Sequence, residues 1–247
     1  MIQAQDHPDI RCEWGSSAVA ALSADVDATI IVDVLSFSTA VDAAVSKAAH
    51  IYPFAWRDDW ARAFAQANHA QLAFQRQDQS DGPTPIPMQP TLSPPSLLQL
   101  EPGARLVLPS PNGSHLTTQA QSRHIFTACL GNHGAVAAAA QTVARTILVV
   151  PADERWPDGS MRPALEDWLG AGAVIAQLSG TKSVEAMAAA AAHGQFADHL
   201  SETIYATTSG RELCALGFER DVEFAVARDV SLAAPYLTNG AYSAFVK

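Results

Sequence analysis

Apolar runs of strand length alternate along this chain with short polar turns and with stretches of small apolar residues. The clearest example spans 29–45, where the β-branched run 29–32 is followed by Asp33, by hydroxyl residues, and then by an alanine- and valine-rich segment. An uninterrupted β-branched run is typical of a strand buried on both faces. Serine and threonine favour helix N-termini. The pattern therefore predicts a strand, a polar turn and a buried helix, in this order.

The same order of strand and helix recurs towards the end of the chain. Further strands are expected at 50–54, 105–109, 124–127 and 146–150, with a weaker one at 71–75. Helices are expected at 18–22 (capped by Ser16 or Ser17), 135–144, 183–193 and 196–207, and from about 58, 163, 209 and 221. Strands that alternate with helices form mainly parallel sheets. We predict an α/β fold, a mainly parallel sheet flanked by helices, in one domain over 1–247 or two closely packed subdomains. A C-terminal hairpin of 235–237 and 241–246 is compatible with the pattern.

The segment 77–102 interrupts this alternation. Its composition is dominated by proline, at Pro83, Pro85, Pro87, Pro90, Pro94, Pro95 and Pro102. Proline is excluded from the interior of regular elements, so the segment is expected to be a long irregular loop. Because the strand and helix pattern resumes unchanged afterwards, a loop folded over one domain is favoured over a linker between two.

Polar residues gather where the predicted strands end. Asp33, Ser110, Asn132 and Asp153 each follow an apolar run. In a parallel sheet these ends lie along one edge, where ligands bind and helix N-termini offer free N–H groups. A carboxylate beside such an anion-binding turn predicts a metal ion between the two. Taken singly, Asp33 is equally well explained as a helix cap, and the Asn-Gly pair at 112–113 as an ordinary turn.

The charge composition of the chain limits the kinds of partner that it can bind. The formal net charge is -10, and the lysines are Lys47, Lys182 and Lys247 alone. Nucleic-acid binding needs a basic face, so we expect no nucleic-acid partner. A small phosphorylated metabolite remains compatible, because local N–H groups and a metal can hold a phosphate against the overall field. With no apolar stretch of membrane-spanning length and no signal-like N-terminus, we expect a cytoplasmic protein without a membrane partner. A homodimer stays open.

Two further patterns carry little chemistry of their own. Cys12, Cys129 and Cys214 are widely spaced and include no CxxC pair, so neither disulfides nor a zinc site are indicated. The glycines of the GAG segment at 170–172 lack the third glycine of a dinucleotide-binding turn and follow a helical pattern. The acidic pair at 166–167 just before them faces either solvent or the polar edge of the sheet.

Several motifs together resemble one known family. DVLSFST, SPNGS, GNHG, PADERW and EDWLGAGA occur in this order, and SGREL follows near the end. In this order they are similar to the motifs of the 2-phosphosulfolactate phosphatase (ComB-like) family of Mg2+-dependent acid phosphatases. The resemblance covers most of the chain. It implies an α/β fold with a site at the strand ends, Mg2+ as cofactor, and a small organic phosphate monoester as substrate.

The departures from the family pattern fall on chemically important positions. The arginine that follows DVL in the family is Ser36 here, Val32 replaces a frequent cysteine, and the central loop reads Leu92, Ser93, Pro94. Arginine holds a phosphate at two oxygens at once, so its loss removes a phosphate clamp. Arg155 or Arg211 could supply the missing charge from another loop.

The resemblance and the strand-end pattern together assign candidate roles. The catalytic candidates are Asp33, Glu166 and Asp167. Oxygen ligands suit Mg2+, and the metal candidates are Asp33, Glu154 and Glu166. The candidates for binding the phosphate are Ser36, Ser38, Thr39, Asn112, Gly113, Ser114, Asn132 and Arg211. The attacking group is left open between a metal-bound water and a carboxylate.

Two other functions remain to be weighed. The first is a binding or regulatory protein that kept the fold and lost hydrolysis together with the arginine. The second is a hydrolase that uses Ser114 with His115 or His133, which is weaker because the chain contains no GxSxG turn.

Overall fold

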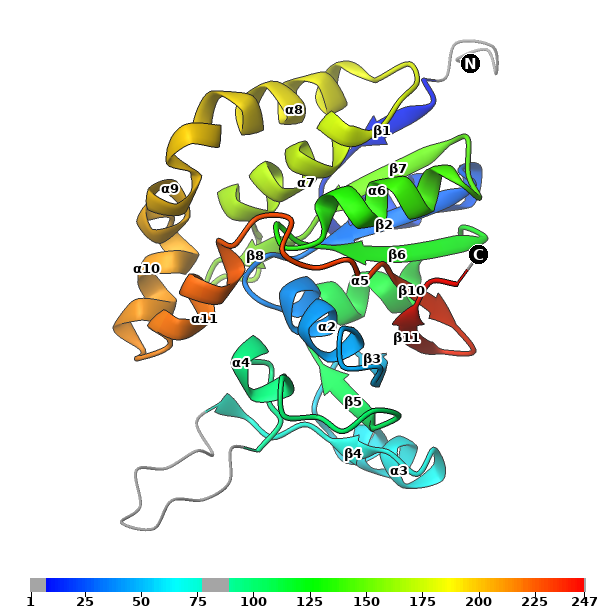
Figure 1. Ribbon diagram of the computed structural model, residues 1–247, viewed down its shortest axis with the longest axis vertical. Helices are drawn as coiled ribbons and strands as arrows, with labels where there is room; N and C mark the ends of the chain where they lie inside the picture. The colour runs from blue at the N-terminus through cyan, green and yellow to red at the C-terminus, as the bar shows by residue number, and fades with distance from the viewer. Residues whose placement is uncertain (1–7, 77–88, 247) are drawn as a thin grey trace.

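A sheet of nine strands organises the part of the chain that this computed structural model describes, residues 8–76 and 89–246 (Figure 1). The strands lie in the order β1-β7-β2-β6-β10-β11-β3-β5-β4. Their bounds are β1 (Ile10–Cys12), β2 (Ala28–Val32), β3 (His50–Phe54), β4 (Gln71–Leu72), β5 (Arg105–Pro109), β6 (His124–Ala128), β7 (Ile147–Pro151), β10 (Pro235–Thr238) and β11 (Ala241–Ala244). The predicted α/β fold with a mainly parallel sheet is confirmed.

Helices connect the strands and pack on the sheet. They are α1 (Gly15–Leu22), α2 (Phe37–Val45), α3 (Asp59–Ala67), α4 (Pro94–Leu97), α5 (Gly113–Gln119), α6 (His133–Gln141), α7 (Leu165–Gln177), α8 (Val184–Phe196), α9 (Leu200–Ala206), α10 (Thr208–Ala215) and α11 (Glu219–Ala225). None of the helices in the described ranges combines the length and the apolar character needed to cross a bilayer.

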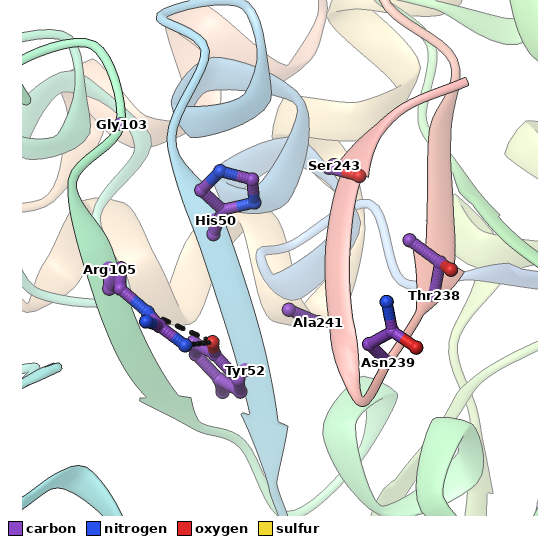
Figure 2. Close-up of a pocket in the computed structure, with 8 residues that line it drawn as sticks. All are labelled: His50, Tyr52, Gly103, Arg105, Thr238, Asn239, Ala241 and Ser243. Atoms are coloured by element: carbon purple, nitrogen blue, oxygen red, sulfur yellow. Dashed lines mark hydrogen bonds between the residues drawn. The ribbon is translucent and has the colours of Figure 1, made fainter. Parts of the chain in front are cut away.

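The sheet consists of two parallel groups of strands joined by the C-terminal hairpin. β1, β7, β2 and β6 are mutually parallel, and so are β3, β5 and β4. Between the groups, β10 pairs antiparallel with β6 and β11 pairs antiparallel with β3. The hairpin turn uses Asn239 and Gly240, whose positive φ values of 51° and 78° suit a two-residue turn (Figure 2). The expected hairpin is thus present, and it forms the bridge in the middle of the sheet.

Helices cover both faces of each parallel group, which explains why the central strands are apolar at successive positions. In β2, Ile30 packs in one core cluster with α6 and α7, whereas Ile31 points to the opposite face and packs with α1 and α5. In β3, Ile51 packs with α2 and α4, and Tyr52 packs with α3 on the other face. Both groups of strands are therefore buried between two helical layers.

Two local predictions were wrong, and one element, the ribbon after β7, was not expected from the sequence. Helix α1 begins at Gly15 with Trp14 in the capping position, and neither Ser16 nor Ser17 caps it. The proline-rich segment contains the short helix α4, whose two prolines occupy its first positions, where a missing N–H costs nothing. Residues 77–88 of that segment lie outside the described residues. After β7, the chain forms a two-stranded ribbon, β8 (Asp153–Arg155) and β9 (Met161–Pro163), before α7 begins.

We expect Tyr242→Ala to weaken the hairpin bridge severely. The Tyr242 side chain is fully buried against Phe37, and its hydroxyl lies 2.9 Å from Thr117 Oγ1. Loss of the ring leaves a cavity, so the free energy of unfolding measured in urea should fall by about 3 to 5 kcal/mol. The neighbouring change Ser243→Ala, on the other face of the strand, should cost less than about 0.5 kcal/mol. Equal effects at the two positions would contradict a bridging role for the hairpin.

Candidate active site

Asp33 lies where two helix N-termini meet at the end of β2. Its Oδ1 accepts a hydrogen bond from the Phe37 N–H at 3.1 Å, at the start of α2, and its Oδ2 accepts one from the Gly113 N–H at 2.9 Å, at the start of α5. The N-terminus of a helix favours negative charge. Gly113 is required there because a Cβ would lie 2.2 Å from the Phe37 ring. Asp33 is therefore a helix cap, as the simpler interpretation has it, and at the same time a carboxylate at the expected ligand-binding edge.

A cavity of about 230 Å³ opens beside Asp33 at this edge of the sheet. Residues from six separate segments line it, and they are Asp33, Leu35, Ser36, Arg76, Leu92, Ser110, Pro111, Asn112, Glu154, Ser209, Glu212, Leu213 and Leu216. Five of the sequence-predicted site residues thus belong to or border the cavity: Asp33, Ser36, Asn112, Glu154 and, through its N–H on Asp33, Gly113. The ends of β2, β5 and β7 therefore converge at this cavity, although the hairpin pairings make the group that contains β5 antiparallel to the group that contains β2.

Four acidic side chains are in electrostatic contact around this cavity. Burial, with a smaller contribution from Glu166, raises the pKa of Asp33 to about 6. Burial, followed by repulsion from Asp33, raises the pKa of Glu154 to about 7, although a hydrogen bond from the Asn112 side chain opposes this. Burial and the same neighbours hold the pKa of Asp167 well above its ordinary value. The cluster therefore carries negative charge that a cation or protons would stabilise.

Glu166 and Asp167 occupy different positions in the cluster. Both are buried at the start of α7, so the alternative in which the acidic pair faces solvent is wrong. Asp167 Oδ1 accepts a hydrogen bond from the Val34 N–H at 2.7 Å, which ties α7 to the turn that follows β2. Glu166 interacts electrostatically with both Asp33 and Glu154. The pair therefore lies behind Asp33, and neither residue lines the cavity.

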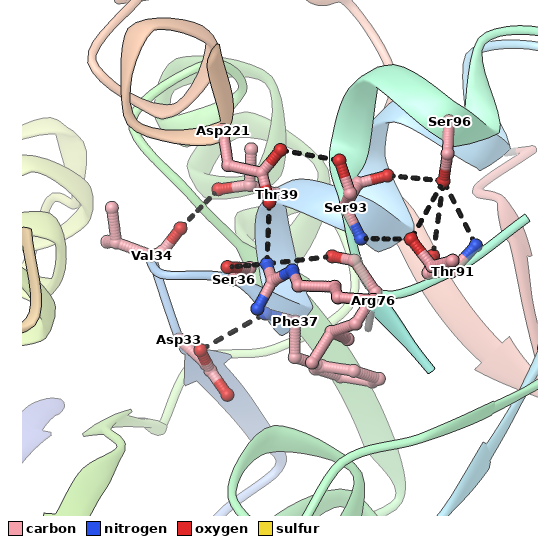
Figure 3. A network of polar contacts seen from close by, with 11 residues as sticks. Asp33, Val34, Ser36, Phe37, Thr39, Arg76, Thr91, Ser93, Ser96 and Asp221 are labelled. Carbon is pink, nitrogen blue, oxygen red and sulfur yellow. Dashed lines mark hydrogen bonds and ion pairs between the residues drawn. The ribbon is translucent and has the colours of Figure 1, made fainter. Parts of the chain in front are cut away.

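Arg76 supplies a guanidinium group that the sequence did not indicate (Figure 3). Its Nη2 donates to Ser36 Oγ at 2.5 Å and lies 2.9 Å from Asp221 Oδ2. The guanidinium also lies over the Phe218 ring, 5.4 Å from the centroid. In turn, Ser93 Oγ donates to Asp221 Oδ1. A positive charge thus lies against the side chain of Ser36, the position at which the family arginine is missing.

The two arginines expected to replace the family arginine do not reach the cavity. Arg155 Nη1 donates to the Gly159 carbonyl at 3.0 Å within the β8–β9 ribbon. Arg211 is exposed on α10 and is not among the lining residues. The cavity is lined by Ser209, Glu212 and Leu213 of that helix and by Leu216, its C-terminal capping residue, which together have the i, i+3, i+4, i+7 spacing of one helix face. Helical periodicity applied to SGREL would therefore have selected Ser209 and excluded Arg211.

Ser209 has the clearest unused hydrogen-bonding capacity in this cavity. Its Oγ is buried and has no hydrogen-bond partner among the described residues. Buried polar atoms are almost always paired, so a lone hydroxyl in a cavity wall indicates a ligand atom or water. Arg162, on β9, forms an ion pair with Glu212 at 3.1 Å. Its positive charge also lowers the pKa of Glu154, which opposes the effect of burial.

Three predicted phosphate ligands instead fix the backbone of the site. Ser38 Oγ accepts from the Asp33 N–H at 2.8 Å and lies 2.6 Å from Thr127 Oγ1. Thr39 Oγ1 donates to the Val34 carbonyl at 2.7 Å, and Ser114 Oγ donates to the Leu108 carbonyl at 2.8 Å. None of the three side chains lines the cavity. They hold the turns that present Asp33 and Gly113.

Asn132 belongs to a separate buried network. Its Nδ2 donates to Asp42 Oδ1 at 3.0 Å, and its Oδ1 accepts from the Cys129 N–H at 2.8 Å. Ser231 Oγ also donates to Asp42 Oδ1 at 2.7 Å. The expectation that Asn132 shares the cavity of Asp33 is therefore wrong, because its amide is used within the turn after β6.

The geometry also argues against the serine hydrolase alternative. His133 Nδ1 lies 2.9 Å from the Leu130 carbonyl and its Nε2 lies 3.2 Å from Asp229, so both ring nitrogens are engaged. The Ser114 hydroxyl is bonded to backbone. No hydrogen bond joins Ser114 to a histidine among the described residues.

The donor set around Asp33 is compatible with Mg2+. In residues 8–76 and 89–246, no group of three or more His, Cys, Asp or Glu side chains is placed so that it could hold a metal ion. Mg2+ commonly uses one or two carboxylates and completes its shell with water and phosphate oxygens. Here the acidic groups are all carboxylates, two of them line the cavity, and burial with mutual repulsion disfavours their charged forms. These residues fit such an ion.

The fold and the cavity define an α/β protein with an acidic cavity where several of its strands end. Residues 18–240 match the model of the 2-phosphosulpholactate phosphatase family, and the chain belongs to this family. The resemblance deduced from the motifs is confirmed.

Curated relatives carry the corresponding names. A probable 2-phosphosulfolactate phosphatase of Thermotoga petrophila is 30% identical over 141 residues, 57% of this chain and 60% of the relative. The 2-phosphosulfolactate phosphatase of Methanothermobacter thermautotrophicus is 32% identical over 138 residues, 56% of this chain and 58% of the relative. A probable enzyme of the same name from Gloeobacter violaceus is 34% identical over 140 residues, 55% and 56% of the two chains. The chain thus spans less than two thirds of the length of the relatives it matches.

We expect the stability of the metal-free protein to fall as the pH rises towards neutrality. The raised pKa of Glu154 means that the folded protein keeps a proton that the unfolded chain releases between its ordinary value of 4.5 and about 7. The unfolded state then binds fewer protons, so the free energy of unfolding falls through this window. Glu154→Gln, a neutral mimic, should recover on the order of 1 kcal/mol at pH 8 and little at pH 4.

Urea denaturation at both pH values, with chelator present, measures this difference. The exposed Glu101, changed to Gln, serves as the control and should leave the pH dependence as in the wild type. A Glu154→Gln variant with the wild-type slope would contradict the raised pKa.

Proposed function

We propose that this protein is a Mg2+-dependent phosphatase that hydrolyses a small organic phosphate monoester, similar to 2-phosphosulfolactate. The observation that carries the proposal is that the carboxylates of Asp33 and Glu154 and the guanidinium of Arg76 line one cavity. The membership of the family and the names of the curated relatives support it. A volume of about 230 Å³ lies below the size of pockets for drug-like molecules, which favours a metabolite of few atoms.

Arg76 is the proposed phosphate-binding residue. Its guanidinium has more donors than its contacts with Ser36 and Asp221 use, and a planar fork suits phosphate oxygens. The unpaired hydroxyl of Ser209 offers one further donor in the same cavity. Asp221 keeps Arg76 in place from behind, with Ser93 donating to the carboxylate of Asp221.

Asp33, in the cavity wall, is the proposed metal-holding residue, and Glu166, buried behind it, is the proposed second carboxylate for the metal. Both N–H donors on Asp33 fix its carboxylate, so that it presents a defined pair of oxygens without rearrangement. When bound, Mg2+ would neutralise phosphate charge and polarise the phosphoryl group. Asp167 holds the turn after β2 through the Val34 N–H, and so sets the position of Asp33.

Glu154 is the proposed proton acceptor. It lines the cavity directly, and its pKa of about 7 falls near the value that suits general base catalysis at neutral pH. At neutral pH a carboxyl group with this pKa is partly ionised, and its ionised form can accept a proton. In the reaction, a water oxygen bonds to phosphorus, the ester P–O bond breaks, and the proton taken from water passes to the leaving alkoxide. The products are an alcohol and inorganic phosphate.

We expect Asp33→Asn to abolish Mg2+-dependent turnover. The change removes the charge that a metal ligand needs and retains the side-chain volume, so release of phosphate from a panel of small monoesters should fall by at least about a hundredfold. The thermal stabilisation that Mg2+ gives the wild type should also vanish. Circular dichroism verifies that the variant is folded, and Glu166→Gln provides a second test.

Asp42 supplies a matched control for this experiment. It is also a buried aspartate, its pKa is raised to about 6 by burial, and it lies outside the cavity. Asp42→Asn should keep both turnover and the response to Mg2+. If no substrate releases phosphate with Mg2+ or with chelator, the protein is a ligand-binding member of the family, and wild-type turnover in Asp33→Asn would refute the assignment of Asp33.

We expect Arg76→Gln to raise KM by about tenfold or more, because the charge-assisted contact to phosphate is lost. Arg76→Lys should restore part of the affinity, since it keeps the charge without the planar fork. The control is Arg211→Gln, on the exposed side of α10, which should leave KM and kcat unchanged. Steady-state kinetics on the best monoester of the panel decides between the two arginines, and a larger effect at Arg211 would overturn this assignment.

A further inference from the structure

A second cavity lies away from the Asp33 site, over the amino ends of β3 and β5 and the tip of the β10–β11 hairpin (Figure 2). Its volume is about 370 Å³. The residues that line it are His50, Tyr52, Gly103, Arg105, Thr238, Asn239, Ala241 and Ser243. Arg105 begins β5, whereas the chain that follows its last residue, Pro109, lines the other cavity. Arg105 and Pro109 are four residue steps apart along β5, or about 13 Å. The two cavities are therefore distinct.

The register of the strands explains why this cavity exists. His50 pairs with Arg105, and the Tyr242 to Ile51 pairing places Ser243 beside His50 and Ala241 beside Tyr52. Five side chains therefore project from the same face of the sheet, and they are His50, Tyr52, Arg105, Ala241 and Ser243. Those of Tyr242 and Ile51 project from the opposite face. The side chains that β11 contributes, Ala241 and Ser243, are small, whereas those of β3 and β5 are larger. This difference in side-chain size leaves the space that forms the cavity. On this face, Phe64 of α3 packs edge-on against the Tyr52 ring, with the ring centroids 5.7 Å apart.

The lining carries positive charge and hydrogen-bond donors. Arg105 is the fixed charge of the cavity, and no Asp or Glu is among the lining residues. No carboxylate forms an ion pair with Arg105 in the part of the chain that the structure describes. Thr238, Asn239 and Ser243 add a hydroxyl, an amide and a second hydroxyl. This composition contrasts with a chain whose formal net charge is -10.

Tyr52 orients the guanidinium group. Its hydroxyl oxygen accepts hydrogen bonds from Arg105 Nε, at 3.0 Å, and from Nη2. The guanidinium also lies over the Tyr52 ring, 5.4 Å from the centroid. Because the oxygen accepts from Arg105, the hydroxyl proton of Tyr52 and the Nη1 protons of Arg105 can donate to a ligand. A held arginine with adjacent donors suits an oxyanion, since little freedom is lost on binding.

We propose that this cavity is a second binding site for a small oxyanion, a carboxylate or phosphate of a metabolite, with Arg105 as its anchor. The site is separate from the proposed phosphatase site, and it stands whether or not the Asp33 cavity is catalytic. Such a ligand would contact β3 and β5 of one parallel group and the hairpin that joins this group to the other.

Amide NMR of the full chain tests the proposal with inorganic phosphate and with malonate as probes. The backbone amides of Gly103 and Asn239 report on this cavity, while those of Asn112 and Gly113 report separately on the Asp33 site. In the wild type, both Gly103 and Asn239 should shift saturably, with a Kd in the millimolar range or below. Tighter saturation by phosphate indicates a phosphoryl ligand, and tighter saturation by malonate indicates a carboxylate.

Arg105→Gln should weaken this saturation by about tenfold or more and leave the shifts at Asn112 and Gly113 as in the wild type. Ser243→Val fills the cavity floor without touching the charge and should have the same local effect, which covers the case that Arg105→Gln does not fold. The matched control is Arg123→Gln, an exposed arginine next to the amino end of β6, with no expected change. Non-saturating shifts in the wild type, or equal saturation in Arg105→Gln, would overturn the proposal.

Discussion

The burial of the Asp33 carboxylate between two helix N-termini is the constraint on which the site depends. A buried carboxylate is costly unless N–H groups or cations satisfy it, and here the Phe37 and Gly113 N–H groups donate to its two oxygens. This arrangement fixes where α2 and α5 begin. It also requires glycine at position 113, because any side chain would meet the Phe37 ring. The local structure of three segments is thus set by one side chain.

The C-terminal hairpin connects the two groups of strands whose ends form the Asp33 cavity. β2, which leads to Asp33, and β5, which leads to Asn112, belong to different parallel groups, and the groups meet only through β10 and β11 in the described sheet. The cavity between these strand ends therefore depends on residues near the end of the chain. The helices that precede the hairpin add Ser209 to the cavity wall and Asp221 behind Arg76. The family match, over residues 18–240, includes both groups and the hairpin turn.

Patterns that repeat locally could be predicted from the sequence, and contacts between distant segments could not. The β-branched run 29–32 and the Asn-Gly pair at 239–240 specify their own conformation through burial and positive φ, and both predictions were confirmed. The hydroxyl groups of Ser38 and Thr39 could bind a phosphate. In the folded protein, however, they form hydrogen bonds with a hydroxyl and a carbonyl group of the protein, and these contacts depend on the three-dimensional structure. Arg76 lies 40 residues from Ser36, and no motif marks it.

The position of Arg76 changes the meaning of the missing family arginine. The electrostatic effect of an arginine depends on the position of its guanidinium group and not on its place in the sequence. The guanidinium of Arg76 donates a hydrogen bond to the hydroxyl of Ser36, so its positive charge lies at that position. Asp221 offsets the charge of Arg76, and Arg162 offsets that of Glu212, so the cavity with Asp33 and Glu154 remains acidic on balance. A phosphate ester would be repelled from such a cavity on Coulombic grounds, and a divalent ion held by the carboxylates reverses the sign. The acidic surplus that argues against binding an anion alone is therefore the strongest physical argument for binding it together with a metal.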